Sequence, residues 1–147
     1  MSIKLVVAKA HKAHLEQEDA RKELQSVEEE LNKVQLDYTE GTVNFVFVKG
    51  IYQHIDRALL TVCVFVNKTG KPIKEIHGVM RLSFVKEQAV LAKATLDFDE
   101  EFLGVIQPDE GLLFHINIPA KGLKEDKEFI FSDITGSLDD VRVTYAE

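Results

Sequence analysis

The chain has 147 residues, a formal net charge of −7 and 45% hydrophobic residues. This length accommodates one ordinary domain with an appendage, and this apolar content can fill one core. The acidic balance argues against binding to a nucleic-acid backbone or to an anionic membrane surface, because both partners require a basic face. The single cysteine, Cys63, excludes a disulfide bond within the chain.

No apolar run approaches the length of a transmembrane segment, and no signal-peptide core is visible at the N-terminus. We therefore expect a cytoplasmic protein, exported only if a leader has been removed. The charge likewise predicts that the partners include no nucleic acid.

Residues 1–40 have the pattern of an amphipathic helix. The stretch 10–38 is rich in Glu, Lys, Leu, Gln and Ala and contains no Gly or Pro. Its apolar residues recur at steps of four and three, which is a heptad pattern typical of a helix that packs along one stripe. We expect Gly41 to end the helix. The predicted interaction stripe consists of Ala20, Leu24, Val27, Leu31, Val34 and Tyr38.

The stripe predicts a contact but leaves its partner open. The helix either docks on its own β domain or on another protein, or it pairs with a second copy of the chain. Leucine at heptad position a with valine at d reverses the preference of parallel dimers. A parallel pair would set Glu23 against Glu28 of the other copy and Glu16 beside Arg21, so repulsion and attraction roughly cancel. We therefore favour docking over self-association. His11 and His14 lie one turn apart without a third ligand nearby, so we expect two solvated histidines.

From residue 41 onward the apolar positions alternate, which is typical of β-strands. Val43, Phe45 and Phe47 share one face of the first strand. The stretch 60–66 is apolar on both faces, which predicts a central strand. About seven strands predict a mainly β fold, an antiparallel immunoglobulin-like β-sandwich over residues 41–147 that follows the helical segment 1–40. The later strands are expected within 76–85, 86–98 and 112–118, at Phe129 and Phe131, and from Val141 to Tyr145.

The densest acidic run contains Asp97, Asp99, Glu100 and Glu101. Clustered carboxylates are the ligands that Ca²⁺ prefers, so the run is a candidate calcium loop. The alternative is a solvated acidic loop, because the twelve-residue loop of an EF-hand is absent.

The remaining reactive residue types predict no catalytic site. Cys63 lies between Val62 and Val64 and is expected to be a buried apolar thiol. His77 and His115 have no carboxylates at ligand spacing in the sequence, so we expect no metal site there. The chain also lacks a recognisable nucleophile–base pair. The sequence therefore predicts a protein that is not an enzyme and needs no cofactor.

Two short stretches carry a recognisable pattern. In residues 64–73, an apolar strand runs into an Asn, a short polar turn and Pro-Ile. Leu96-Asp97-Phe98 is followed by Leu-Gly-Val-Ile-Gln-Pro over residues 103–108. These stretches resemble the two landmarks of SLAP domains, which are small bacterial modules associated with accessory Sec secretion and S-layer-like proteins. The resemblance implies an immunoglobulin-like sandwich without a known active site.

These observations predict a non-enzymatic bacterial module for protein interaction, whose helix mediates docking or self-association through the stripe. The alternative is a ligand-binding β-sandwich module that takes calcium or a surface polymer.

Overall fold

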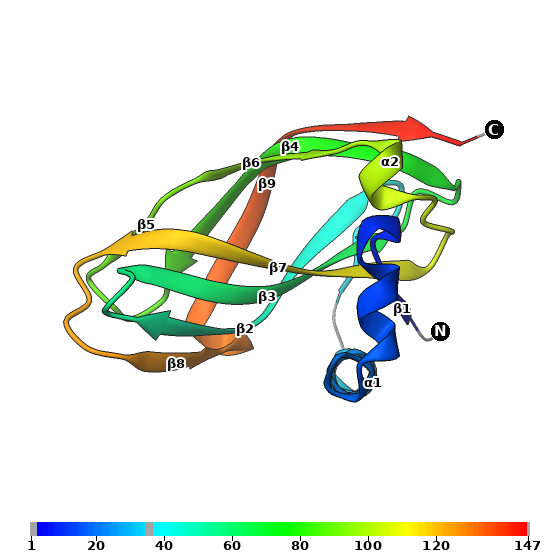
Figure 1. The fold of residues 1–147 in the computed structure, drawn as a ribbon. Helices are drawn as coiled ribbons and strands as arrows, with labels where there is room; N and C mark the ends of the chain where they lie inside the picture. The colour runs from blue at the N-terminus through cyan, green and yellow to red at the C-terminus, as the bar shows by residue number, and fades with distance from the viewer. Residues whose placement is uncertain (1–2, 35–36, 147) are drawn as a thin grey trace.

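The computed structural model describes residues 3–34 and 37–146, except the side chain of His14, and it is mainly β, as the sequence predicts. The first sheet has the strand order β1–β7–β3–β2–β8, and β5 pairs with β7 at one end (Figure 1). Its strands are β1 (Lys4–Val7), β2 (Val43–Gln53), β3 (Ala58–Asn67), β5 (Val90–Leu91), β7 (Glu110–Lys121) and β8 (Lys127–Ile130).

The second sheet is antiparallel and has the order β6–β4–β9. Its strands are β4 (Ile73–Phe84), β6 (Ala94–Phe98) and β9 (Ile134–Tyr145). The helical segments are η1 (Lys9–Glu16) and η2 (Phe131–Asp133), both of 3₁₀ type, and the α-helices α1 (Glu18–Lys33) and α2 (Glu100–Leu103). Among the described residues, no helix is long and apolar enough to cross a membrane.

The main hydrophobic core fills the space between the two sheets. Three rings pack together here, with Phe65 and Phe114 contributed by the first sheet and the half-buried Phe98 by the second. Their centroids lie 4.8–6.0 Å apart, at separations where aromatic pairs attract one another. The face of β2 predicted from Val43, Phe45 and Phe47 points into this core.

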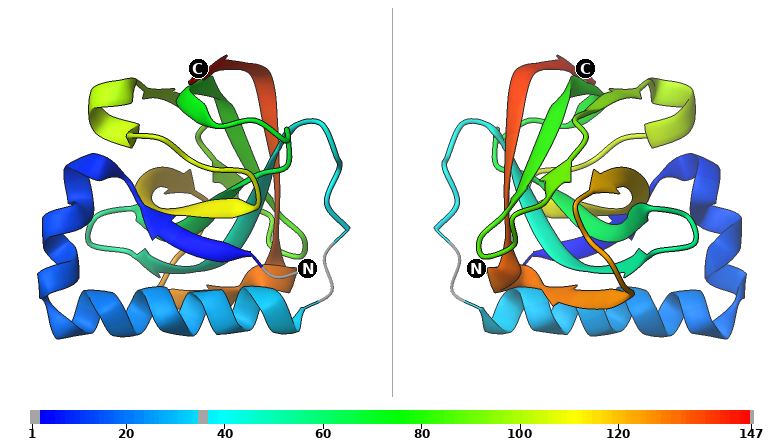
Figure 2. Two further views of the ribbon diagram at one scale, coloured as in Figure 1. Left: turned by 90° about the vertical axis from the view of Figure 1, so that its right-hand side faces the viewer. Right: turned by 90° about the vertical axis from the view of Figure 1, so that its left-hand side faces the viewer.

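A second core lies on the outer face of the first sheet. The odd–even alternation of β3 places Val62, Val64 and Val66 on this face, where they form one buried cluster with Val27 and Leu31 of α1. Figure 2 shows α1 lying lengthwise along this side of the sheet. The prediction of a central strand is confirmed, because β3 stands in the middle of the first sheet and is buried on both faces.

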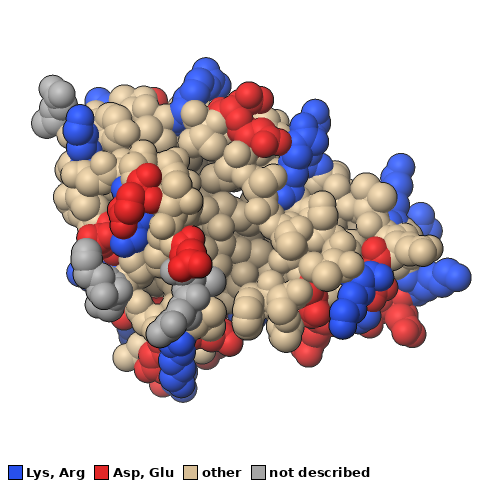
Figure 3. All heavy atoms as spheres, turned by 180° about the vertical axis from the view of Figure 1, so that it is seen from behind, with Lys and Arg blue, Asp and Glu red and all other residues tan. Residues whose placement is uncertain are grey.

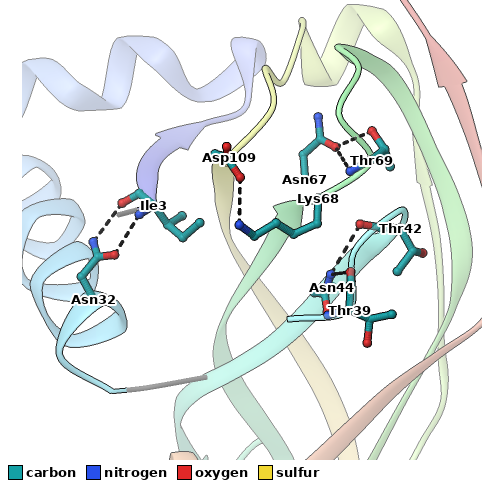
Figure 4. A network of polar contacts seen from close by, with 9 residues as sticks. All are labelled: Ile3, Asn32, Thr39, Thr42, Asn44, Asn67, Lys68, Thr69 and Asp109. Carbon is teal, nitrogen blue, oxygen red and sulfur yellow. Dashed lines mark hydrogen bonds and ion pairs between the residues drawn. The ribbon is translucent and has the colours of Figure 1, made fainter. Parts of the chain in front are cut away.

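Two side chains of α1 also pair with the backbone of the edge strand β1 and the residue before it. The Asn32 side chain accepts a hydrogen bond from the Ile3 N–H (2.8 Å) and donates one to the Ile3 carbonyl (2.9 Å), as Figure 4 shows. A Glu28 carboxylate oxygen accepts from the Leu5 N–H at 2.8 Å. Backbone groups that a neighbouring strand would otherwise satisfy are therefore bonded to the helix.

The single predicted helix over 10–38 is wrong in its bounds. The structure has η1, an extended Gln17 (φ −84°, ψ 132°) and then α1, which ends at Lys33. Val34 is again extended, and Tyr38 lies outside any helix. Gly41 does not end the helix but occupies a turn at φ +85°, because residues of low helix propensity such as Val34 and Thr39 already intervene.

The strand prediction also needs three corrections. Phe131, which is expected in a strand, lies in η2. The described residues contain nine strands rather than about seven, because β1 was not predicted and the stretch 86–98 divides into β5 and β6. The first sheet is mixed rather than purely antiparallel, because β1 pairs with β7 in parallel. The four-residue apolar run at the N-terminus is too short to show strand periodicity, so its role depends on the partner that it meets.

We predict that Leu31→Asp lowers the free energy of unfolding by at least about 3 kcal/mol. Loss of a buried Leu side chain alone costs roughly 2–5 kcal/mol, and the buried carboxylate adds a desolvation penalty. Chemical denaturation followed by circular dichroism measures the change. Gln25→Asp is the matched control, because Gln25 is exposed on the same helix. Equal effects of the two changes would contradict the packing of α1 on the sheet.

Candidate interaction groove

An open groove with a volume of about 250 Å³ runs between α1 and the neighbouring β-strands. One wall is formed by Val27, Leu31 and Val34, at the C-terminal half of α1 and just beyond it. The first half of β2, residues 44–48, forms part of the lining. Figure 3 shows the molecule from the rear of Figure 1, where a hollowed and mostly uncharged area occupies the middle of the face.

The opposite side of the groove comes from the segment that joins the two sheets. Phe131 of η2 and Ile134 and Gly136 at the start of β9 lie here. A Cβ atom at Gly136 would overlap the ring of Phe45. Glycine is therefore the residue that permits β9 to approach β2 so closely at this end of the groove.

The structure divides the predicted interaction stripe between two environments. Val27 and Leu31 are buried in the second core, and Leu24 packs against it. Val34 and Tyr38 are half-buried and line the groove, together with one edge of Val27 and Leu31. Ala20, at the start of the stripe, is half-buried and does not line the groove. Val27 and Leu31 therefore stabilise the chain's own fold, whereas Val34 and Tyr38 contribute to an open surface.

The charged residues of the groove are acidic. Glu30 and Asp37 are the ionisable carboxylates in its lining, and none of the described lining residues is Lys, Arg or His. Tyr38 is partly withdrawn from water, and this burial raises the pKa of its hydroxyl. The Lys68 ammonium lies 5.4 Å from the Tyr38 ring centroid, but it is bound at 2.9 Å to Asp109.

The four acidic side chains of the candidate calcium loop do not converge on one point, because they have different partners or are exposed. Asp97 binds His77 at 2.9 Å, and Asp99 accepts the Phe102 N–H at the start of α2. Glu100 and Glu101 follow in the first turn of α2, where both are exposed. Among the described residues, no group of three or more His, Cys, Asp or Glu side chains could hold a metal ion.

Two histidines have carboxylate partners that the sequence analysis missed. His77 contacts Asp97 across the β4–β6 ladder and Glu75 on its own strand, and His115 binds Glu23 of α1 at 2.8 Å. At the level of the sequence these histidines are considered only as metal ligands, so Asp97 and Glu23, which strand register and helix docking bring to them, are not foreseen. His11 lies edge-on to the Phe102 ring with centroids 5.1 Å apart, and the His14 side chain lies outside the described residues.

Cys63 is fully buried, as predicted, and is the chain's one cysteine. Its burial raises the pKa of the thiol to about 12, while a weak hydrogen bond to the Thr61 hydroxyl acts in the opposite direction. A thiol is nucleophilic as the thiolate, so Cys63 has the properties of a core residue rather than of a reactive group.

The two stretches that carry the family resemblance meet around Asn67, which is 2% exposed. Its amide nitrogen donates to the carbonyls of Lys71 (2.9 Å) and Ile106 (3.0 Å). Its oxygen accepts from the N–H and the hydroxyl of Thr69 (Figure 4). Ile73 also forms an isolated β-bridge with Ile106. These motif residues therefore fasten the turn after β3 to the turn before β7.

We predict that Asn67→Asp destabilises the chain by about 2–4 kcal/mol, although the side chain keeps its size. The new carboxylate cannot donate to the two carbonyls and is buried beside them. Thermal and urea unfolding measure the loss. Asn117→Asp, at an exposed position of β7, is the matched control and should be nearly neutral. A loss no larger than that of the control would show that the Asn67 network does not stabilise the turns.

We also predict a pH-dependent contribution from His77. Its hydrogen bond to Asp97, helped by Glu75, raises the pKa of the imidazole above about 6.5, so the folded state favours the charged form. The stabilisation is complete below the unfolded pKa and disappears as the pH rises through the folded pKa. The difference in unfolding free energy between wild type and His77→Gln should therefore be larger at pH 5.5 than at pH 8.5.

The control for this prediction removes the partner instead of the histidine. In an Asp97→Asn background, the effect of His77→Gln should depend much less on pH. If the wild-type difference is the same at both pH values, the ion pair contributes nothing measurable.

Comparisons of the chain with known proteins find no relative. No family model matches the chain. No curated protein and no solved structure matches it either.

Proposed function

We propose that this chain is a non-enzymatic module for protein interaction, and that it binds a partner protein through the groove beside α1. The observation that carries the proposal is the mostly apolar groove that Val34, Tyr38, the first half of β2 and Phe131 leave open to solvent. An apolar groove of this kind is one of the features that mark protein-interaction sites.

The size and shape of the groove favour side chains of a partner over an enclosed small ligand. Its volume of about 250 Å³ is below the range of roughly 300–1,000 Å³ that is usual for small-molecule sites. Apolar surface also continues at the neighbouring Ile130 and Phe131, which are 58% and 47% exposed. An interface that extends over such a surface suits a polypeptide better than a compact ligand.

Docking on a different protein is favoured over pairing of two α1 helices. Val27 and Leu31, at the centre of the heptad pattern, are buried against Val62, Val64 and other residues of the first sheet. A coiled coil through the same stripe would have to detach α1 and expose that sheet face, at a large cost in buried apolar area.

We further propose that the domain is an immunoglobulin-like sandwich of the SLAP type, in a bacterial protein. The two sheets on either side of one core support the first part, and the contacts between the two motif stretches through Asn67 and Ile106 support the second. The cytoplasmic location and the absence of catalysis stay predictions from the sequence.

Site-specific photo-cross-linking in the cells of origin tests the interaction function. A photoreactive amino acid in place of Val34 should give an adduct of defined mass with another protein, and the adduct should be lost in the Phe131→Asp background. The control replaces Glu101, which is exposed on α2 and does not line the groove. Adducts between two copies of the chain would indicate self-association, and identical adducts from both positions would contradict a docking groove.

A further inference from the structure

We propose that the groove recognises a basic amphipathic segment, in which two or three apolar anchors are flanked by Lys or Arg. This inference rests on the proposed interaction function and specifies the chemistry of the partner. It follows from what lines the groove, from the charge at its mouth and from the charge of the whole chain.

The mostly apolar lining of the groove is complementary to apolar side chains of a partner. Phe45, Val46 and Phe47 of β2 lie in the lining of the groove, together with Val34 and Phe131. The Asn44 amide in this lining is already bonded to the carbonyls of Thr39 and Thr42 (Figure 4). Branched or aromatic side chains that leave water for this surface would supply the affinity, as in complexes where an amphipathic segment lies in an apolar groove.

The acidic side chains at the groove are complementary to Lys or Arg residues that flank the apolar anchors of the partner. The Glu30 and Asp37 side chains are exposed at the groove, and within the described residues neither forms an ion pair. The sequence of α1 adds to this field, because it contains six Asp or Glu residues and three Lys or Arg residues. A partner with Lys or Arg beside its apolar anchors would therefore meet a complementary potential, which raises the association rate and excludes acidic competitors.

The same charges disfavour the other occupants. A second copy of this chain also carries a net charge of −7, so two copies would meet across acidic groove mouths. An acidic segment would place its carboxylates near Glu30 and Asp37, and none of the described lining residues carries a positive charge to offset the repulsion. The groove is therefore more complementary to a basic polypeptide than to any surface of the chain itself.

Designed peptides test this inference directly. The probe is a fluorescein-labelled 15-residue peptide of Leu and Lys, with Leu at helical spacing, and its counterpart replaces every Lys by Glu. Fluorescence anisotropy with the full chain measures both affinities at low and at near-physiological salt. We expect the Leu–Lys peptide to bind at least about tenfold more tightly, which corresponds to about 1.4 kcal/mol.

Charge-reversal variants locate the binding. Glu30→Lys with Asp37→Lys should weaken the Leu–Lys peptide at least about tenfold and favour the Leu–Glu peptide. Glu16→Lys with Glu125→Lys changes the net charge by the same amount at exposed positions outside the groove, and should have less than about a threefold effect. Phe131→Ser, which removes an exposed apolar wall residue, should weaken both peptides.

Several results would overturn the inference. Equal losses in the two charge-reversal variants would mean that the peptide senses only the overall charge. Equal affinity for the two peptides, or tighter binding of the Leu–Glu peptide, would refute the basic flank, and binding of neither peptide would refute an amphipathic occupant. A groove-dependent cross-link at Val34 would uphold the proposed function in each of these cases, so the two failures are distinguishable.

Discussion

The burial of β3 on both faces is the constraint on which the rest of the structure depends. Cys63 and Phe65 point into the main core, whereas Val62, Val64 and Val66 point the other way. One sheet can cover only one of these faces, so the second requires a separate cover. The helix α1 supplies that cover, and the stretch before α1 is tied to the same sheet through the parallel pairing of β1 with β7.

The groove arises because this cover is incomplete. The helix ends at Lys33, and the chain then returns toward β2 through Tyr38, which stays half-buried beside Lys68. The first half of β2 is therefore only partly shielded, with Val46 and Val48 packed at the margin of the second core. The close approach of β9 at Gly136 completes the other side. A structural requirement, the need to cover β3, thus also determines where an open apolar surface is left.

The sequence predicts those features that depend on local periodicity. The stripe from Leu24 to Leu31 and the two apolar faces of β3 follow from spacing alone, so they could be recognised without a structure. The strand β1 could not, because four residues carry too little periodicity and the strand exists through β7. The partners of His77 and His115 could not be predicted from the sequence either, because Asp97 and Glu23 reach them through strand register and helix docking. The groove itself is made by three distant segments and has no local signature.

The pairing of Asn32 and Glu28 with the backbone at β1 has a consequence for aggregation. An open strand edge is a template on which another chain can add a strand, and proteins protect such edges by charge, by bulges or by a covering element. Here the covering element is a helix that uses an amide and a carboxylate in place of a neighbouring strand. Transient release of α1 would uncover that edge together with the valines of β3, so local opening of the helix is enough to expose a template for misassembly without global unfolding.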